Sequence, residues 1–322
     1  MALYAFDGTM NEINNDPGQD TNVRKFFLAF DEAYKSNINN PGRNFYVEGV
    51  GTRLSVIGKF FGGVFGVGGQ DRIAEAKKAL EENLEKGDCE INVIGFSRGS
   101  ALALEFINDI EKAIARDEPL RAKSEKILLN KDDKVRFLGL WDTVGSFGMP
   151  GNNINLGYEL TVPPIVTSCF HAIALDERRR TFPLTRMVQD RFSDTTKKVD
   201  IQEVWFRGYH SDVGGGNSNT GLSNITLHWM YNNAISCNLA IADSYITTAQ
   251  QGCRNDVPCK KPGMDIKENK KRTIKPYDQV HDSVVWREFA DDFPANNPPR
   301  GLKVVNDAGE HVGDFPGRPG AN

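Results

Sequence analysis

The sequence predicts an α/β protein with a mostly parallel central sheet and helices on both faces of that sheet. Short apolar runs alternate with helix-like segments along the chain, which is the pattern of parallel strands joined by crossover helices. The chain has 322 residues, which is enough to bury a full-sized core. Because 39% of the residues are apolar, disordered and fibrous classes are excluded.

Each predicted element follows from a local pattern. Five apolar runs are predicted as strands: residues 2–6, 44–47, 90–94, 135–141 and 202–206. A helix is predicted over residues 71–86, where apolar residues recur at steps of three and four and Gly87 provides a stop. Two further helices, residues 100–115 and 222–242, are expected to cover the sheet.

The chain is expected to form one catalytic domain over residues 1–290 and a loosely attached tail, rich in proline and glycine, over residues 291–322. Residues 54–70 are apolar and rich in glycine, so they fit either a lid over a binding site or a buried connector. Residues 250–277 form a basic insertion. Between positions 254 and 275, eight Lys and Arg stand against three Asp and Glu, which suits either contact with anionic lipid or a solvated loop.

The charge balance and the absence of sorting signals bear on partners and location. A net charge of −4 generates no field that would hold a polyanion, so nucleic acid is not expected as a partner. No membrane-spanning apolar run occurs and the first residues lack the basic start of a signal peptide, so we expect a chain made in the cytoplasm. Among the five cysteines only Cys253 and Cys259 are close enough to suggest a disulfide, and neither a metal nor a cofactor is expected.

The strongest chemical signal lies at residues 91–100. A buried-type strand enters the motif Gly95-Phe96-Ser97-Arg98-Gly99 and is followed by a helix, which is the context of a nucleophile elbow. The turn forces Ser97 into a strained backbone conformation, and glycines two residues to either side let the strand and the helix approach each other. Ser97 is therefore the candidate nucleophile of an acyl-transfer reaction.

A serine hydroxyl needs a histidine to take its proton and a carboxylate to orient that histidine. In hydrolases with this elbow, the acid and then the histidine follow the serine along the chain. We prefer Asp212 with His281, because Asp212 stands in a loop just beyond a predicted strand, where the acid is usually found. Asp142 with His210 satisfies the same order and stays as the alternative. Structural or solvated positions are expected for the other histidines: His171, His228 and His311.

The expected oxyanion hole consists of two backbone N–H donors. Arg98, the residue after the nucleophile, supplies the first. The loop directly after the first strand, with Gly8 and Thr9, is the expected source of the second, because Gly8 allows close approach of the backbone to a substrate.

Six sequence blocks together resemble one known family. They are Phe6-Asp7-Gly8-Thr9, Gly49-Val50-Gly51-Thr52, Gly95-Phe96-Ser97-Arg98-Gly99, Trp141-Asp142-Thr143-Val144-Gly145, His171-Ala172-Ile173-Ala174-Leu175-Asp176-Glu177 and His210-Ser211-Asp212-Val213-Gly214-Gly215-Gly216. The blocks resemble the α/β-hydrolase family of bacterial and fungal proteins that includes the first class of type VI secretion lipase effectors. The similarity spans roughly residues 3–289.

The resemblance implies an α/β-hydrolase fold and a serine acylhydrolase, with phospholipase A activity in the effector members. It also implies a lipid or phospholipid ester substrate, peripheral contact with a membrane, an immunity protein or secretion-system carrier as partner, and export by a type VI secretion system.

Two other classes of protein function stay open. One is a non-catalytic partner-binding protein of a secretion system that retains the fold. The other is a metal-dependent phosphodiesterase built from Asp7, His210, Asp212, His281 and Asp282.

Overall fold

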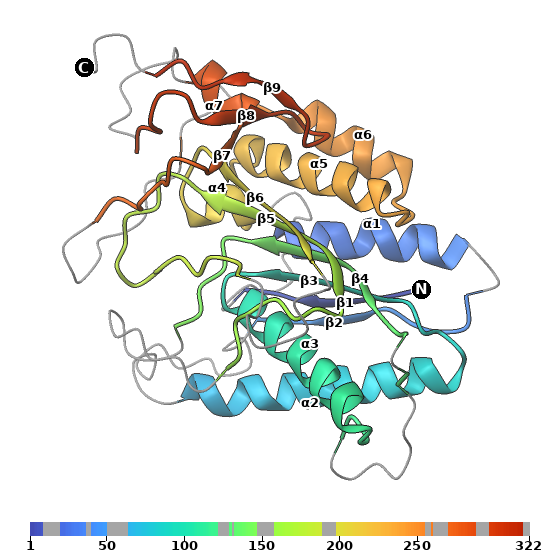
Figure 1. The fold of residues 1–322 in the computed structure, drawn as a ribbon. Coiled ribbons are helices and arrows are strands. Elements are labelled where there is room, and N and C mark those ends of the chain that lie inside the picture. Colours follow the sequence, from blue (N-terminus) through green and yellow to red (C-terminus); the bar gives the residue numbers. More distant parts are fainter. Residues whose placement is uncertain are drawn as a thin grey trace.

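The computed structural model describes residues 1–8, 20–36, 40–49, 64–121, 129–130, 132–146, 158–188, 198–254, 259, 270–287 and 296–317. Within these residues the strands form a nine-stranded sheet in the order β2-β1-β3-β4-β5-β6-β7-β8-β9 (Figure 1). Neighbouring strands from β2 to β8 pair in parallel, and β9 pairs antiparallel with β8. The predicted α/β architecture with a mostly parallel sheet is confirmed.

The strands are β1 Ala2–Phe6, β2 Phe45–Val47, β3 Ile91–Phe96, β4 Val135–Trp141, β5 Val166–Ala174, β6 Asp200–Phe206, β7 Gln279–His281, β8 Lys303–Val305 and β9 His311–Asp314. The helices are α1 Asn22–Ser36, α2 Val64–Glu85, α3 Arg98–Arg116, α4 His210–Gly214, α5 Gly221–Ser236, α6 Asp243–Gly252 and α7 Asp282–Arg287. All five predicted strands are present, with boundaries shifted by two residues or fewer.

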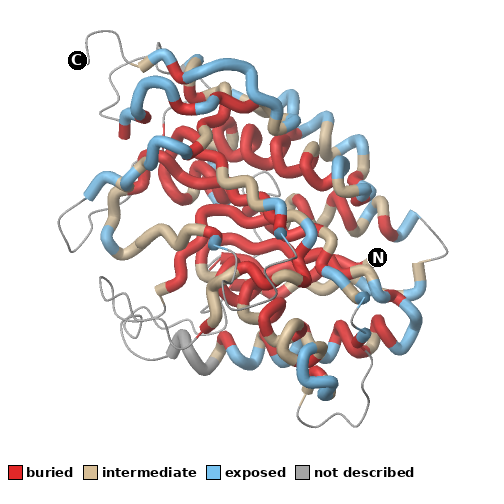
Figure 2. The backbone as a smooth tube through the Cα atoms, in the orientation of Figure 1, coloured by how far each residue is buried: buried red, intermediate tan, exposed pale blue. Residues whose placement is uncertain are grey.

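Helices cover both faces of the sheet. Helices α2 and α3 pack together on one face, and α1 and α5 pack together on the other, with α6 against α5 (Figure 1). In β1, Tyr4 and Phe6 join the core on the side of α2 and α3, whereas Leu3 and Ala5 join the core on the side of α1 and α5. Because both faces are covered, β1 is buried along its whole length. Figure 2 shows buried backbone concentrated in the sheet and along the helices that cover it.

The strand order places one end of β1 beside the start of α3. Strand β2 lies on one side of β1 and β3 lies on the other, so the chain changes direction across the sheet at this point. In open α/β sheets the crevice at the carboxyl ends of the strands at such a point is the usual ligand site. Here it brings the loop after Phe6 next to the elbow at Ser97, because a Cβ atom on Gly99 would overlap the carbonyl oxygens of Phe6 and Asp7.

Several elements differ from the prediction. The segment that begins at His171 has a helix-like pattern, but residues 171–174 form the end of strand β5. The sequence pattern does not reveal this strand, because its second half is buried on both faces and lacks alternation. Helix α2 begins at Val64 rather than at residue 71. Helix α5 ends at Ser236 rather than at residue 242, because Asn238 adopts a left-handed conformation with φ 63°.

The C-terminal segment also differs from the loosely attached tail expected over residues 291–322. Strands β8 and β9 extend the sheet beyond β7. Leu302, Val304 and Phe315 are buried in a small cluster with Trp205 of β6. The low apolar content of the segment conceals these strands, because only a few of its side chains face the core.

Parts of two sequence hypotheses fall outside the described residues. In the candidate lid or connector, residues 54–63 are not described, and the rest of that run belongs to α2. In the basic insertion, residues 255–258 and 260–269 are not described. None of the described helices is long and apolar enough to cross a membrane. All five cysteines are free thiols in the structure, including Cys253 and Cys259.

Candidate active site

Ser97 lies at the sharp turn between β3 and α3. Its backbone has φ 58° and ψ −126°, a strained conformation for a residue with a side chain. The turn is held from the neighbouring strand, because the N–H of Ser97 donates to the carbonyl oxygen of Trp141 at 3.0 Å and its carbonyl accepts from Val144 N–H at 3.2 Å. A Cβ atom on Gly95 would overlap the backbone of Ser100. The motif therefore has glycine where strand and helix come closest.

His210 connects Ser97 to Asp142. Its Nε2 lies 2.8 Å from the hydroxyl oxygen of Ser97, and its Nδ1 lies 2.6 Å from Oδ2 of Asp142. Asp142 directly follows β4, the neighbour of β3 in the sheet, so its side chain and the elbow share one edge. The aromatic rings of Phe96 and Phe182 contact the imidazole, with centroids at 4.6 and 4.8 Å. These contacts fix the plane of the histidine ring.

Charge determines which nitrogen of His210 carries the proton. Burial alone would raise the pKa of Asp142, but Arg272 and His210 outweigh it and hold that pKa well below its ordinary value. The carboxylate is therefore ionised and accepts a hydrogen bond from the Nδ1–H of His210. Burial lowers the pKa of His210 even though Asp142 opposes the shift, so the ring is neutral near pH 7 and its Nε2 can accept the proton of Ser97.

The preferred pair, Asp212 and His281, is not brought to Ser97. His281 is the last residue of β7, which is four strand positions from β3, or about 19 Å at the usual spacing of about 4.8 Å. Its Nε2 contacts Asp307 at 3.1 Å, and its Nδ1 contacts Ser283 at 2.9 Å. The alternative pair, Asp142 and His210, lies beside Ser97 instead.

Asp212 has a local structural position. It is the third residue of α4, and its carboxylate accepts a hydrogen bond from the N–H of Tyr209 at 3.0 Å, which closes a capping box. Its other oxygen lies 3.3 Å from the amide nitrogen of Asn217. The carboxylate thus fixes the start of the short helix that carries His210.

The expected oxyanion donors lie around the elbow. Arg98 directly follows Ser97 and begins α3, so its backbone N–H stands at the position of the first expected donor. Gly8 N–H points at the carboxylate of its neighbour, 2.6 Å from Oδ1 of Asp7. Thr9 lies outside the described residues. The structure thus places Arg98 next to the nucleophile, but the N–H of Gly8 is donated to Asp7 and does not serve as the expected second donor.

Asp7 anchors the start of the loop after β1. It is buried and accepts hydrogen bonds from the hydroxyl groups of Thr21 and Tyr46, both at 2.6 Å. Burial raises the pKa of Asp7 to about 6, although these hydrogen bonds oppose the shift.

Three charged side chains at the site were not predicted as site residues from the sequence. Arg272 donates from both terminal nitrogens to the two oxygens of Asp142. Glu177 accepts the backbone N–H of His210 at 3.2 Å, and Asp176 accepts that of Gly208 at 2.8 Å. Asp176 and Glu177 stand in one of the six matched blocks, which is the signal that could have identified them.

His171 is a structural residue, as expected, and it supports the loop that carries the acid. Its Nε2 accepts the N–H of Thr143 at 3.1 Å, and its Nδ1 lies 2.9 Å from Glu203. A nitrogen that accepts from a backbone N–H carries no proton, so Nδ1–H donates to Glu203. Thr143 follows Asp142 directly, and this contact fixes the backbone of the turn.

The residues considered for a metal centre are spread over separate networks. Asp7 contacts Thr21 and Tyr46, whereas His281 contacts Asp307. Across the described ranges, three or more His, Cys, Asp or Glu side chains do not gather in a way that could hold a metal ion.

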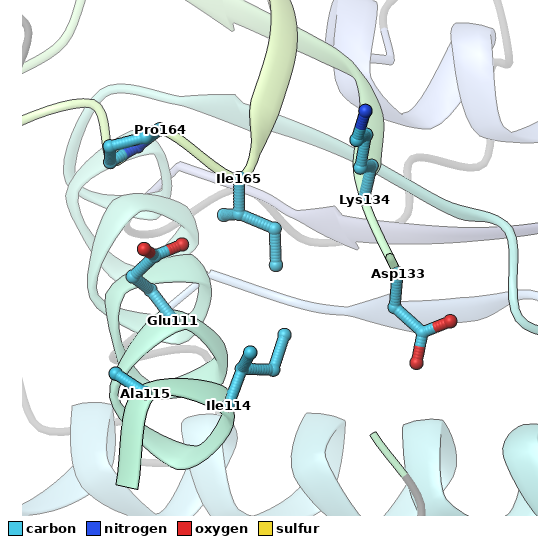
Figure 3. Close-up of a pocket in the computed structure, with 7 residues that line it drawn as sticks. All are labelled: Glu111, Ile114, Ala115, Asp133, Lys134, Pro164 and Ile165. Atoms are coloured by element: carbon cyan, nitrogen blue, oxygen red, sulfur yellow. The ribbon is translucent and has the colours of Figure 1, made fainter. Parts of the chain in front are cut away.

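A pocket of about 190 Å³ lies away from this site (Figure 3). Glu111 and Ile114 line it from the last turns of α3, and Asp133 and Ile165 line it just before β4 and β5. It therefore sits at the amino ends of the strands, opposite the edge that carries Ser97. This pocket is not the place where a substrate would meet the serine.

The parallel sheet, its covering helices and the strand–elbow–helix unit define an α/β-hydrolase fold. The family model described as "T6SS, Phospholipase effector Tle1-like, catalytic domain" matches residues 3–112 and 106–233, which together make up more than half of the chain. The chain belongs to this family of Tle1-like catalytic domains.

Two solved structures are similar at low identity. One is the crystal structure of an uncharacterized protein from Pseudomonas aeruginosa, with 20% identity and a TM-score of 0.49, covering 78% of this chain and 48% of that one. The other is the Tle1 effector bound to the VgrG spike from the type VI secretion system, with 23% identity and a TM-score of 0.39, covering 68% of this chain and 51% of that one. The chain thus spans about half the length of each. A search of curated protein sequences found no match.

Proposed function

We propose that this chain is a serine acylhydrolase of the phospholipase A type, with Ser97 as nucleophile, His210 as general base and Asp142 as the acid that orients the base. One observation carries the proposal: Ser97, His210 and Asp142 are linked in series, at 2.8 and 2.6 Å, with the serine on a strained elbow. That is the arrangement that activates a hydroxyl group toward an ester carbonyl.

The reaction follows from these contacts. The hydroxyl oxygen of Ser97 attacks the ester carbonyl carbon while its proton moves to Nε2 of His210, and Asp142 stabilises the imidazolium. The N–H of Arg98 stabilises the negative charge on the carbonyl oxygen, and a second N–H donor is expected beside it. His210 then gives the proton to the departing alcohol, which leaves an acyl-Ser97 ester. Water, deprotonated by His210, hydrolyses that ester and restores the serine.

Family membership supports the choice of substrate and of partners. The family is described as phospholipase effectors of the type VI secretion system, so we assign phospholipid esters as substrates and a secretion-system carrier as partner. An immunity protein would then be required in the producing cell. Export by that system is part of the same proposal.

The proposed function is tested on the full purified chain. It is incubated with p-nitrophenyl butyrate and, separately, with phosphatidylglycerol and phosphatidylethanolamine vesicles, and the products are analysed by mass spectrometry. Free fatty acid and lysophospholipid are expected. Release of phosphorylated headgroup instead would indicate a phosphodiesterase, and no product from any substrate would favour a non-catalytic binding protein.

The pH dependence of ester hydrolysis is expected to reflect His210. The base must be neutral to accept the proton of Ser97, and burial lowers the pKa of His210 from 6.5. Activity is therefore lost as pH falls through the lowered pKa, and the acid limb of kcat/KM is expected below pH 6.5. The profile is measured with a soluble ester from pH 4 to 9. An acid limb above pH 7 would contradict a neutral buried base.

The basic insertion is expected to matter for vesicles and not for soluble esters. Lys270 and Lys271 are exposed, and Lys260 and Lys261 belong to the same segment. Replacing all four by Gln is expected to weaken binding to anionic vesicles by about 1 kcal/mol per charge at low salt. Cosedimentation with vesicles measures this, and hydrolysis of p-nitrophenyl butyrate is the control. Unchanged binding would make the insertion an ordinary solvated loop.

A further inference from the structure

Arg272 has a buried side chain, and both terminal nitrogens of its guanidinium group donate to the proposed acid. Its side chain is 7% exposed although it belongs to the basic insertion. One terminal nitrogen, Nη1, donates to Oδ1 of Asp142 and, at 2.8 Å, to the carbonyl oxygen of Ala174. The other, Nη2, donates to Oδ2 of Asp142 at 3.0 Å and to the carbonyl oxygen of Phe182 at 3.2 Å.

These contacts complete the hydrogen bonding of the Asp142 carboxylate. A carboxylate has about four acceptor sites. Oδ2 accepts from His210 and Arg272, and Oδ1 accepts from Arg272 and, at 2.9 Å, from the N–H of Ala174. With every site occupied, the carboxylate cannot rotate about its bond to Cβ without breaking several hydrogen bonds. The oxygen that faces His210 is therefore held in one position.

The segment that carries Arg272 is also tied to the loop that carries the base. The backbone carbonyl of Arg272 accepts from the amide nitrogen of Asn296 at 2.8 Å, and the N–H of Asn296 donates to Asp176 at 3.0 Å. Asp176 in turn accepts the N–H of Gly208, two residues before His210, at 2.8 Å. The position of Arg272 is thus linked both to Asp142 and to the loop that carries His210.

We propose that Arg272 is a positioning residue for ester hydrolysis: its guanidinium holds the Asp142 carboxylate in the orientation that aligns His210 with Ser97. This inference rests on the proposed function and adds to it a fourth residue, supplied by the C-terminal part of the chain. A buried ion pair contributes little to stability on balance, because desolvation offsets the attraction, so this geometry favours a role in the site.

The positive charge of Arg272 also lowers the pKa of His210 directly, in addition to its contact with Asp142. Burial is the main cause of the lowered pKa of His210; of the charged groups around it, Asp142 and Glu177 raise that pKa and Arg272 lowers it. Removing the guanidinium charge is therefore expected to raise the pKa of His210. Lysine retains the charge but lacks the planar fork that spans both carboxylate oxygens. The charge and the geometry can thus be separated with two variants.

The test compares Arg272→Gln, Arg272→Lys and Arg186→Gln in the full chain. Arg186 is the matched control, because among the described residues it pairs bidentately with Asp278, which lies six residues after Arg272, and with Glu203, rather than with Asp142. The pKa of His210 is read from ¹⁵N-histidine NMR, with the His210→Gln spectrum as assignment, which requires no enzymatic activity. The kcat/KM for p-nitrophenyl butyrate is measured across pH on the same samples.

Arg272→Gln is expected to raise the pKa of His210, move the acid limb of kcat/KM to higher pH and lower kcat at the optimum by about 10- to 100-fold. Arg272→Lys is expected to leave the pKa of His210 near that of the unaltered chain and to lower kcat. Arg186→Gln is expected to change stability and neither of these readouts.

The inference is overturned if folded Arg272→Gln titrates His210 like the unaltered chain, or if Arg186→Gln shifts it equally. If Arg272→Gln does not fold, a fully active Arg272→Lys variant overturns it. An unaltered chain that hydrolyses no ester contradicts the proposed function, whereas the NMR titration still tests the contact itself.

Discussion

Replacing Ser97 by alanine is expected to abolish hydrolysis of both soluble esters and phospholipids. The hydroxyl oxygen is the atom that forms the acyl-enzyme, so its removal is expected to lower kcat by about 10⁵-fold or more, with any residual rate due to the oxyanion donors alone. The free energy of unfolding is expected to change by less than about 1 kcal/mol, because alanine meets the same backbone strain at φ 58° as serine. Turnover and thermal unfolding of the two proteins measure this.

Ser100 provides a matched control for this variant. It lies three residues further along, in the first turn of α3, is fully buried, and its hydroxyl donates only a long hydrogen bond of 3.4 Å to the carbonyl oxygen of Trp141. Ser100→Ala is therefore expected to stay active. A Ser97→Ala variant that turns over esters near the original rate would remove the serine from the reaction.

Removing the proposed base is expected to be nearly as damaging as removing the nucleophile. His210→Gln is expected to lower kcat by about 10³-fold or more, and Asp142→Asn by a similar factor, because asparagine neither stabilises the imidazolium nor fixes its tautomer. His281→Gln and Asp212→Asn are expected to cost much less. Their side chains hold Asp307 and the start of α4 rather than Ser97.

Folding must be checked in each of these four variants. Asp142→Asn leaves the buried Arg272 without its charged partner, which is expected to cost about 3–5 kcal/mol of stability. Circular dichroism and thermal unfolding separate a misfolded variant from an inactive one. Folded His210→Gln with full activity, together with an inactive His281→Gln, would restore the assignment first preferred from the sequence.

The nucleophile could be predicted from the sequence because its chemistry is local. The elbow requires a buried strand, a serine flanked by two glycines, and a helix, and these stand within residues 91–100. The burial of β3 on both faces and the steric crowding at Gly95 and Gly99 are direct consequences of that short pattern. The α/β class followed in the same way from apolar runs of strand length.

The base and the acid could not be chosen from the sequence, because the choice depends on strand order. Asp142 and Asp212 both follow a strand, and His210 and His281 both come after a candidate acid. Only the sheet order shows that β4 lies beside β3 while β7 lies four positions away. The short helix α4 follows β6 and packs against β5, and its first residue, His210, lies next to Ser97.

Two other features were concealed for different physical reasons. The second half of β5 is buried on both faces, so it lacks the alternation that identifies a half-exposed strand, and its strongly apolar run resembles a buried helix. Arg272 stands among seven other basic residues between positions 254 and 275, and composition favours a solvated position for all of them. Its burial follows from the carboxylate of Asp142, which lies far away in the sequence.

The most direct test of the account is the rate at which a fluorophosphonate modifies the full chain, with the labelled residue identified by peptide mass spectrometry. The unaltered protein is expected to carry one label, on Ser97, and His210→Gln is expected to slow labelling by at least about 100-fold, whereas His281→Gln labels at the original rate. Labelling of another residue, or labelling of Ser97 that depends on His281 and not on His210, would contradict the assignment of Ser97, His210 and Asp142 as the active site.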